Sequence, residues 1–160
     1  GGSTKWFLNK KSKKVIALEN ETSWFNLLLE DKKKYKNLTP VFVNNENDFV
    51  NNTMVFESNV IFLDCDSNYR LKILQNLYKN TDKINSNIKC IVIDDVDKKN
   101  LKGGDIDKIV FDLAQKLNWV QIDFMGLRPS NRVYASTTVL VNPKNKLKRN
   151  FEIKPLSAFS

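Results

Sequence analysis

Residues 59–64 read Asn-Val-Ile-Phe-Leu-Asp, a run of four apolar side chains that ends in an acid. The same pattern occurs in residues 14–19, Lys-Val-Ile-Ala-Leu-Glu, and in residues 89–95, Lys-Cys-Ile-Val-Ile-Asp-Asp. Short apolar runs without polar alternation are typical of parallel strands that are buried on both faces. Stretches with helical spacing separate the runs, which predicts an α/β domain with a mostly parallel sheet.

Helices are predicted between these strands from capping residues and apolar spacing. Asn20 or Thr22 can cap a helix that continues to about Lys34, and Ser67 can cap the next one. A further helix is expected from about residue 105 to residue 117, where apolar residues recur at helical spacing.

The remaining elements are read from shorter signals. Residues 39–43 indicate another strand, whereas residues 44–57 are polar and are predicted to be irregular. Residues 119–124 and 133–141 read as two strands. The segment between them is too short for a crossover helix, so these two strands are expected to form an antiparallel hairpin.

Composition limits the chemistry that the chain can perform. The 160 residues include 26 Lys and Arg against 18 Asp and Glu, a net charge of +8, and no His. Histidine-based triads and histidine zinc sites are therefore excluded. The two cysteines, Cys65 and Cys90, each sit in an apolar run that reads as a strand and are expected to be buried thiols.

The length suits one domain, which we place at residues 1–143, followed by a basic tail at residues 144–160. No apolar run reaches the roughly 18 residues of a membrane span. No secretory leader opens the chain. The sequence therefore predicts a soluble protein of the cytoplasm.

Acids at the carboxyl ends of the predicted strands are the first candidates for a binding site. These acids are Glu19, Asp64, Asp94 and Asp95. Open α/β sheets bind ligands at this edge, and an acid held at a strand end can accept the hydroxyl groups of a ribose. Each acid can equally cap the helix that follows or face water, and the sequence leaves both alternatives open.

The order of the motifs carries a resemblance to a known family. Along the chain they are Gly1-Gly2-Ser3-Thr4-Lys5-Trp6-Phe7, residues 15–19, residues 60–64 with Arg70, residues 91–95, residues 119–126 and residues 137–143. This order resembles the class I S-adenosylmethionine-dependent methyltransferases, in their small-molecule O-methyltransferase-like branch, over nearly the whole chain to Pro143. The family's first strand would lie before Gly1, so we expect a fragment or an altered fold.

The resemblance implies a Rossmann-like three-layer sandwich that binds S-adenosylmethionine. The cofactor-binding residues it implies are Gly1, Gly2, Ser3, Glu19, Asn20, Asn45 and Asp64. It also implies Asp64 and Asp94 as catalytic residues, either of which could act as general base, and Asp95, Arg70 and Arg128 as contacts for the acceptor substrate.

The implied reaction is methyl transfer to an oxygen of a small molecule or sugar. A divalent metal held by Asp64, Asp66, Asp94 and Asp95 is a possibility that the sequence does not favour. The alternative function is a non-catalytic Rossmann-like module whose basic surface binds nucleic acid or a protein partner. Nucleic acid is not the favoured partner, because no aromatic platform with interleaved arginines is present.

Overall fold

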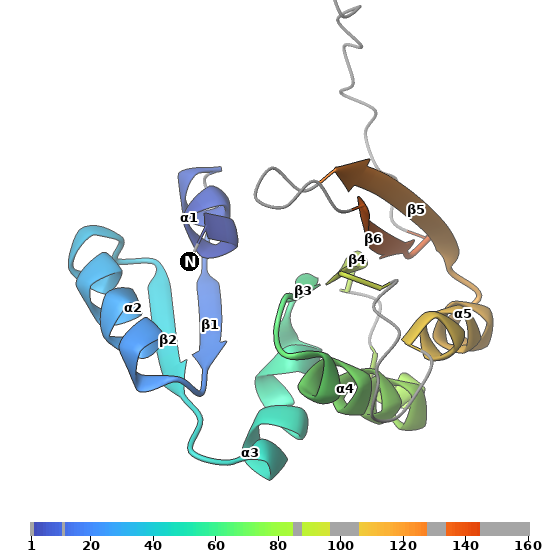
Figure 1. Cartoon of the computed structure of the whole chain (residues 1–160), viewed down its shortest axis with the longest axis horizontal. Coiled ribbons are helices and arrows are strands. Elements are labelled where there is room, and N and C mark those ends of the chain that lie inside the picture. The colour runs from blue at the N-terminus through green and yellow to red at the C-terminus, as the bar shows by residue number, and fades with distance from the viewer. Residues whose placement is uncertain (1, 11, 85–87, 97–105, 128–133, 145–160) are drawn as a thin grey trace, which may run out of the picture.

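The computed structural model describes residues 2–10, 12–84, 88–96, 106–127 and 134–144. Its first part is a small parallel sheet in which β1 (Val15–Glu19) pairs with β2 (Leu38–Phe42). Helix α1 (Gly2–Asn9) precedes β1, and α2 (Thr22–Lys34) connects the two strands. The three lysines that end α2 complement the partial negative charge of its C-terminus. This part is drawn in blue to cyan in Figure 1.

The second part is a four-stranded sheet with the order β3-β4-β6-β5. Its strands are β3 (Val60–Leu63), β4 (Cys90–Asp94), β5 (Val120–Leu127) and β6 (Tyr134–Val141). Strands β3 and β4 are parallel, whereas β6 runs antiparallel to both β4 and β5. The predicted α/β class and the predicted C-terminal hairpin are therefore confirmed. The sheet comes in two pieces, because β1 and β3 belong to different sheets.

The second part contains five described helices, and they differ from the prediction at two places. The helices are α3 (Glu46–Val50), the 3-10 helix η1 (Thr53–Glu57), α4 (Ser67–Lys79), the 3-10 helix η2 (Thr81–Lys83) and α5 (Ile106–Leu117). The prediction that residues 44–57 are irregular is wrong, because the side chains of Asn45 and Asn52 cap α3 and η1. Asp66 rather than Ser67 caps α4. No helix in the described ranges is long and apolar enough to cross a membrane.

One face of the four-stranded sheet forms the main core with α4 and α5. Every second residue of the strands points to this face, and Ile91, Ile93 and Leu140 are completely buried there. Helix α4 contributes Leu74 and α5 contributes Leu113, both also fully buried. A smaller cluster of Leu8, Leu28 and Leu38 holds α1, α2 and β2 together. Two separate clusters thus stabilise the two parts of the chain.

The opposite face of the four-stranded sheet is apolar but open toward β5. The strand register aligns Phe62, Val92, Val139 and Ile122 in one row across all four strands. The ring of Phe7 on α1 contacts Phe62, with ring centroids 5.9 Å apart, at the β3 end of this row. At the β5 end, Ile122 is 41% exposed, and its neighbours on the same face of β5, Val120 and Phe124, are 52% and 56% exposed. The open face therefore offers an apolar surface to solvent.

We predict that lysine at Ile122 and Phe124 together reduces this apolar surface at little cost in stability. Exposed positions usually change the free energy of unfolding by less than about 1 kcal/mol. The fluorescence of a dye that binds apolar surface should fall, and denaturant unfolding should be nearly unchanged. Leu140→Ala, a fully buried control on β6, should cost about 2–5 kcal/mol. If the double lysine variant loses as much as this control, the face is covered in solution.

Candidate functional site

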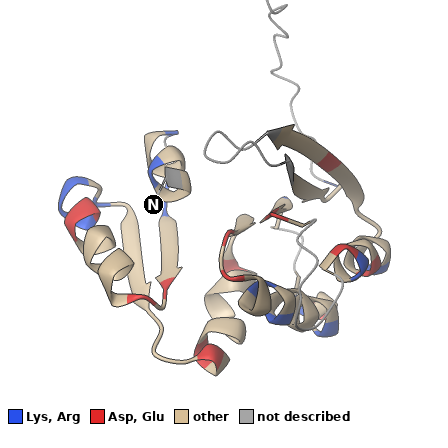
Figure 2. Ribbon diagram, in the orientation of Figure 1, with Lys and Arg blue, Asp and Glu red and all other residues tan. Residues whose placement is uncertain are grey.

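Acids occupy the carboxyl ends of three strands. Glu19 is the last residue of β1, Asp64 directly follows β3, and Asp94 is the last residue of β4. In Figure 2 the acids at these strand ends are drawn in red. Because Leu63 pairs with Ile93 in a parallel register, Asp64 and Asp94 are neighbours at one edge of the sheet. The structure therefore brings together the two residues expected to be catalytic.

Glu19 is half-buried, and one of its carboxylate oxygens is used by the following loop. Oε1 accepts hydrogen bonds from the backbone N–H groups of Asn20, at 2.9 Å, and Glu21, at 3.1 Å. These bonds fix the turn from β1 into α2. Oε2 is then the carboxylate atom that a ligand hydroxyl could reach. Asn20 is exposed beside it.

Asp94 is held in place by a residue that the sequence analysis missed. The hydroxyl group of Thr137 donates a hydrogen bond of 2.6 Å to Oδ1 of Asp94. Thr137 lies on β6, and only the antiparallel register brings it beside Asp94. No local spacing signal could reveal a partner so distant in sequence. The bond orients the carboxylate at the sheet edge.

Asp95, an expected substrate contact, is only 6% exposed and has a backbone φ of 52°. This left-handed conformation is unfavourable for residues other than glycine and persists where the surroundings enforce it. The next residue is also held, because the N–H of Val96 donates to the carbonyl of Ser136 at 3.1 Å. The loop after β4 thus turns sharply inward, which argues against direct contact between the Asp95 side chain and an acceptor.

The loop after β3 carries Asp64, Cys65 and Asp66. Asp64 is exposed. Asp66 accepts a hydrogen bond of 2.8 Å from the N–H of Asn68 and so caps α4. Cys65 is a free, half-buried thiol. Burial raises the pKa of the Cys65 thiol from 9.0 to about 11, although the positive charge of Arg70 acts in the opposite direction. Asp64 is therefore the side chain of this loop that a ligand can meet.

Arg70 was expected to grip an anionic acceptor, but the structure buries it to 3% exposure. Its Nη1 donates to the carbonyl oxygen of Asp95 at 3.1 Å, and its Nη2 donates to the carbonyl oxygen of Cys65 at 2.5 Å. The guanidinium group thus serves the backbone of the two loops that follow β3 and β4. This burial and these partners argue against the expected contact with an acceptor.

Of the remaining expected site residues, Gly2 and Ser3 lie apart from Glu19, and two others lie outside the described residues. These two are Gly1 and Arg128. Gly2 and Ser3 begin α1, which lies in Figure 1 beyond the start of β1, whereas Glu19 closes the opposite end of that strand. The structure does not bring the glycine turn and Glu19 together. Asn45 follows β2, and its Oδ1 accepts from the N–H of Asp48 at 2.9 Å.

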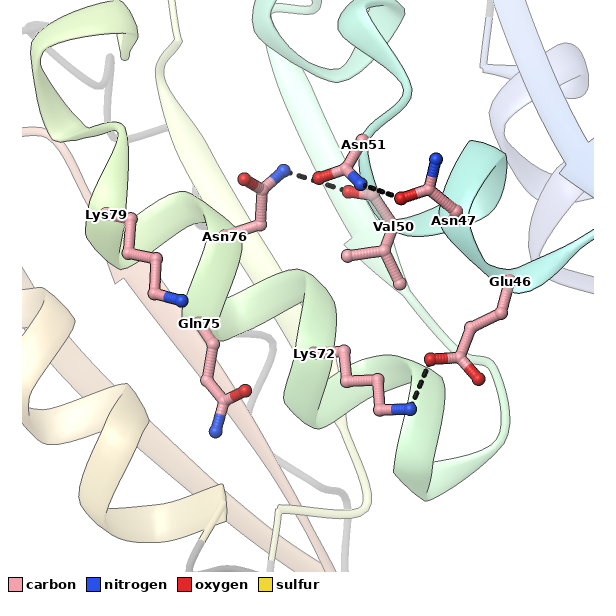
Figure 3. A pocket seen from close by; sticks show the side chains of 8 residues that line it. All are labelled: Glu46, Asn47, Val50, Asn51, Lys72, Gln75, Asn76 and Lys79. Atoms are coloured by element: carbon pink, nitrogen blue, oxygen red, sulfur yellow. Dashed lines mark hydrogen bonds and ion pairs between the residues drawn. The ribbon is translucent and has the colours of Figure 1, made fainter.

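A hollow of about 480 Å³ lies between α3 and α4 (Figure 3). Most of its polar side chains already have partners. Asn76 donates to the carbonyl oxygen of Val50 at 2.9 Å, and Lys72 forms an ion pair with Glu46. These contacts join two packed helices and supply no group that calls for a ligand. The acids at the sheet edge are therefore the better candidate site.

Carboxylates of the kind found at this edge can also bind divalent metals. In the described part of the chain, no three acids or cysteines come together as metal ligands. Asp94 is turned toward Thr137, and Asp66 is used as a helix cap. The arrangement suits hydrogen-bond acceptance from hydroxyl groups better than metal coordination.

No protein-family model matches the sequence, and no curated protein sequence is similar to it. Solved structures do match. The O-methyltransferase from Bacillus cereus, in complex with SAH, aligns with a TM-score of 0.55 at 12% identity over 88% of this chain and 69% of that chain. The O-methyltransferase TomG from Streptomyces achromogenes, in complex with SAM, gives 0.56 at 11% identity over 88% and 68%. Fibrillarin from Aeropyrum pernix, with bound S-adenosyl-L-methionine, gives 0.54 at 12% identity over 80% and 55%.

At sequence identities this low, structural similarity establishes the fold but not the activity. The activity depends on the residues of the site. The chain has the Rossmann-like fold of class I methyltransferases. The resemblance that the motifs indicated is confirmed at this level.

We predict that the thiol of Cys65 makes folding stability depend on pH in the alkaline range. The folded state keeps this proton up to a pKa of about 11, whereas the unfolded chain releases it near 9.0. Its contribution to the free energy of unfolding is complete below pH 9 and decreases as the pH rises to about 11. Denaturant unfolding across this range should lose on the order of 2 kcal/mol less in Cys65→Ser than in the wild type.

Cys90→Ser is the matched control, because burial also raises the pKa of Cys90 and Lys89 opposes that shift. It should change the slope less than Cys65→Ser does. Equal slopes in the wild type and Cys65→Ser would contradict the burial of this thiol.

Proposed function

We propose that the chain binds S-adenosylmethionine at the acidic sheet edge and transfers its methyl group to an oxygen of a small molecule or sugar. The observation that carries this proposal is the charge of the three loops at residues 19–21, 64–66 and 94–96. Six of these nine residues are acids, and none is Lys or Arg, in a chain whose net charge is +8. The carboxylates therefore gather at the strand ends against the overall charge of the molecule.

This charge pattern selects among nucleoside cofactors. A dinucleotide brings phosphate groups, which a cluster of carboxylates repels and which require helix amides or cations. S-adenosylmethionine has no phosphate and carries a positive sulfonium, so acids attract it. Its ribose offers two hydroxyl donors that a carboxylate can accept. The donor set at this edge thus fits this cofactor better than a phosphate-bearing one.

The proposed binding residues follow from their positions. Glu19 accepts the ribose hydroxyl groups, with Asn20 beside it, and Asn45 lies on the loop after β2, toward the adenine. Asp64 faces the methionine end of the cofactor or the acceptor. Contacts from Gly1, Gly2 and Ser3 to the amino-acid end would require α1 to approach the carboxyl edge of β1.

The cofactor supplies a methyl group on a positively charged sulfur, which makes that carbon reactive. The chain aligns the acceptor oxygen in line with the carbon–sulfur bond, so that the oxygen–carbon bond forms as the carbon–sulfur bond breaks. Asp64 or Asp94 takes the proton that the acceptor hydroxyl loses. Proton removal by a positioned carboxylate is typically worth about 10²- to 10⁴-fold in rate.

The alternative is a module that binds nucleic acid or a protein through its basic surface. It is supported by the lysines at the end of α2, which lie away from the acidic loops in Figure 2. Binding through these lysines would weaken steeply as the salt concentration rises. Binding of an uncharged ribose and adenine would depend on salt much less.

We predict micromolar binding of S-adenosylhomocysteine, measured by titration calorimetry, that depends on Glu19. Glu19→Ala removes the ribose acceptor and should weaken binding by about 10- to 100-fold, as expected for hydrogen bonds to a charged group. Glu57→Ala, which removes an exposed acid on η1, is the matched control and should bind like the wild type. No binding by the wild type, together with steeply salt-dependent binding to generic RNA or DNA, would overturn the proposal.

A further inference from the structure

We propose that Arg70 is a positioning residue that ties the loop after β3 to the loop after β4 and thereby fixes Asp64 relative to Asp94. The two carbonyl oxygens that its guanidinium group holds belong to Cys65 and Asp95. Each of these residues directly follows one of the two acids. The proposal rests on the proposed function only where it concerns cofactor binding; the tie itself is a statement about the two loops.

The burial of Arg70 indicates a specific use of its charge. Arg70 is only 3% exposed, so its guanidinium group loses most of its hydration, and this cost must be offset by hydrogen bonds inside the protein. Nη1 and Nη2 each have a carbonyl partner in a different loop, whereas Nε has no hydrogen-bond partner among the described residues. The position of the side chain therefore lets it bind both loops, although one of its hydrogen-bond donors is left without a partner in the described part of the chain.

The hydrogen bonds of Arg70 affect both the loop after β3 and the loop after β4. Asp95 adopts a left-handed backbone, φ 52°, and Arg70 binds its carbonyl oxygen in that conformation. Strand β6 also holds the loop after β4, through Thr137 and the carbonyl of Ser136. The loop after β3 is held by the Asp66 cap of α4 and by the hydrogen bond from Arg70 to the carbonyl oxygen of Cys65. Arg70 thus transmits the fixed position of the β4 loop to Asp64.

Lysine cannot replace Arg70 in this role. The guanidinium group presents two terminal nitrogens in a rigid planar fork, and each reaches one carbonyl oxygen. An ammonium group is a single point of donation on a flexible stem. It can keep the positive charge near Cys65 but cannot hold both loops at the observed separation.

The thiol of Cys65 provides a probe whose response distinguishes a tie from a charge effect. The positive charge of Arg70 lowers the pKa of Cys65, in opposition to burial. If Arg70 acted through its charge alone, its removal would slow the reaction of this thiol with an aromatic disulfide. If Arg70 holds the loop, its removal exposes Cys65 and the reaction becomes faster. In that reaction the Cys65 thiolate forms a mixed disulfide and releases a coloured aromatic thiolate.

The experiment uses the Cys90→Ser chain, in which Cys65 is the sole thiol. We expect Arg70→Met and Arg70→Lys to raise the rate of Cys65 modification by about tenfold or more, since exposure controls thiol access. Both should weaken S-adenosylhomocysteine binding by about tenfold, the effect of losing an aligned contact to a charged group. Leu77→Ala, a fully buried position on the same helix, is the control for general loss of stability and should leave both readouts within about twofold.

The outcomes separate the two proposals. A wild-type chain that does not bind S-adenosylhomocysteine contradicts the proposed function, while the thiol rates still test the tie. Arg70→Lys keeps the positive charge and therefore guards against failure of Arg70→Met to fold. If the thiol of Cys65 in Arg70→Lys reacts more slowly than in the parent chain, or at the same rate, the positioning role is overturned. Equal effects from Leu77→Ala would overturn it as well.

Discussion

The parallel pairing of β3 with β4 is the constraint on which the candidate site depends. It places Leu63 beside Ile93 and therefore puts the residues that follow, Asp64 and Asp94, at one edge. The pairing is enforced from one side by burial, because Ile91 and Ile93 are completely removed from solvent against α4 and α5. A shift of one residue would turn these side chains to the open face and separate the two acids. The hydrophobic core and the position of the carboxylates are thus set by the same register.

The acidic and basic residues occupy different places in the fold, and the arrangement of the strands explains where the acids lie. Parallel strands bring their carboxyl ends to one edge, so Asp64 and Asp94 gather at the edge of the four-stranded sheet, while Glu19 ends β1 of the two-stranded sheet. Lysines occur on several helices of the described part, including the last turn of α2, where the helix dipole stabilises them. A chain with a net charge of +8 therefore presents an acidic edge, which neither its overall charge nor its isoelectric point indicates.

The sequence was sufficient for the strands and for the acids at their ends, because unbroken apolar runs are local signals. The predicted caps were wrong: Glu21, rather than Asn20 or Thr22, precedes α2, and Asp66 caps α4. Asn45 and Asn52 show where this reasoning was incomplete, since both cap short helices in a segment that looked irregular. The burial of Arg70 and the contact between Thr137 and Asp94 could not be predicted at all. Both depend on residues more than twenty positions apart, which only the tertiary fold brings together.

The sheet is divided between β1 and β3, which belong to two different sheets. All five residues of β1 are only half-buried, although four of them are apolar, and a two-stranded sheet on its own is marginally stable. The two-stranded sheet, which carries Glu19, is held by the small cluster of Leu8, Leu28 and Leu38 and by the contact of Leu18 with the main core. The acids of the four-stranded sheet rest on a much larger core. Glu19 therefore lies on the less stable of the two parts, and a ligand that bridges Glu19 and Asp64 would stabilise their relative position as it binds, at the cost of part of its affinity.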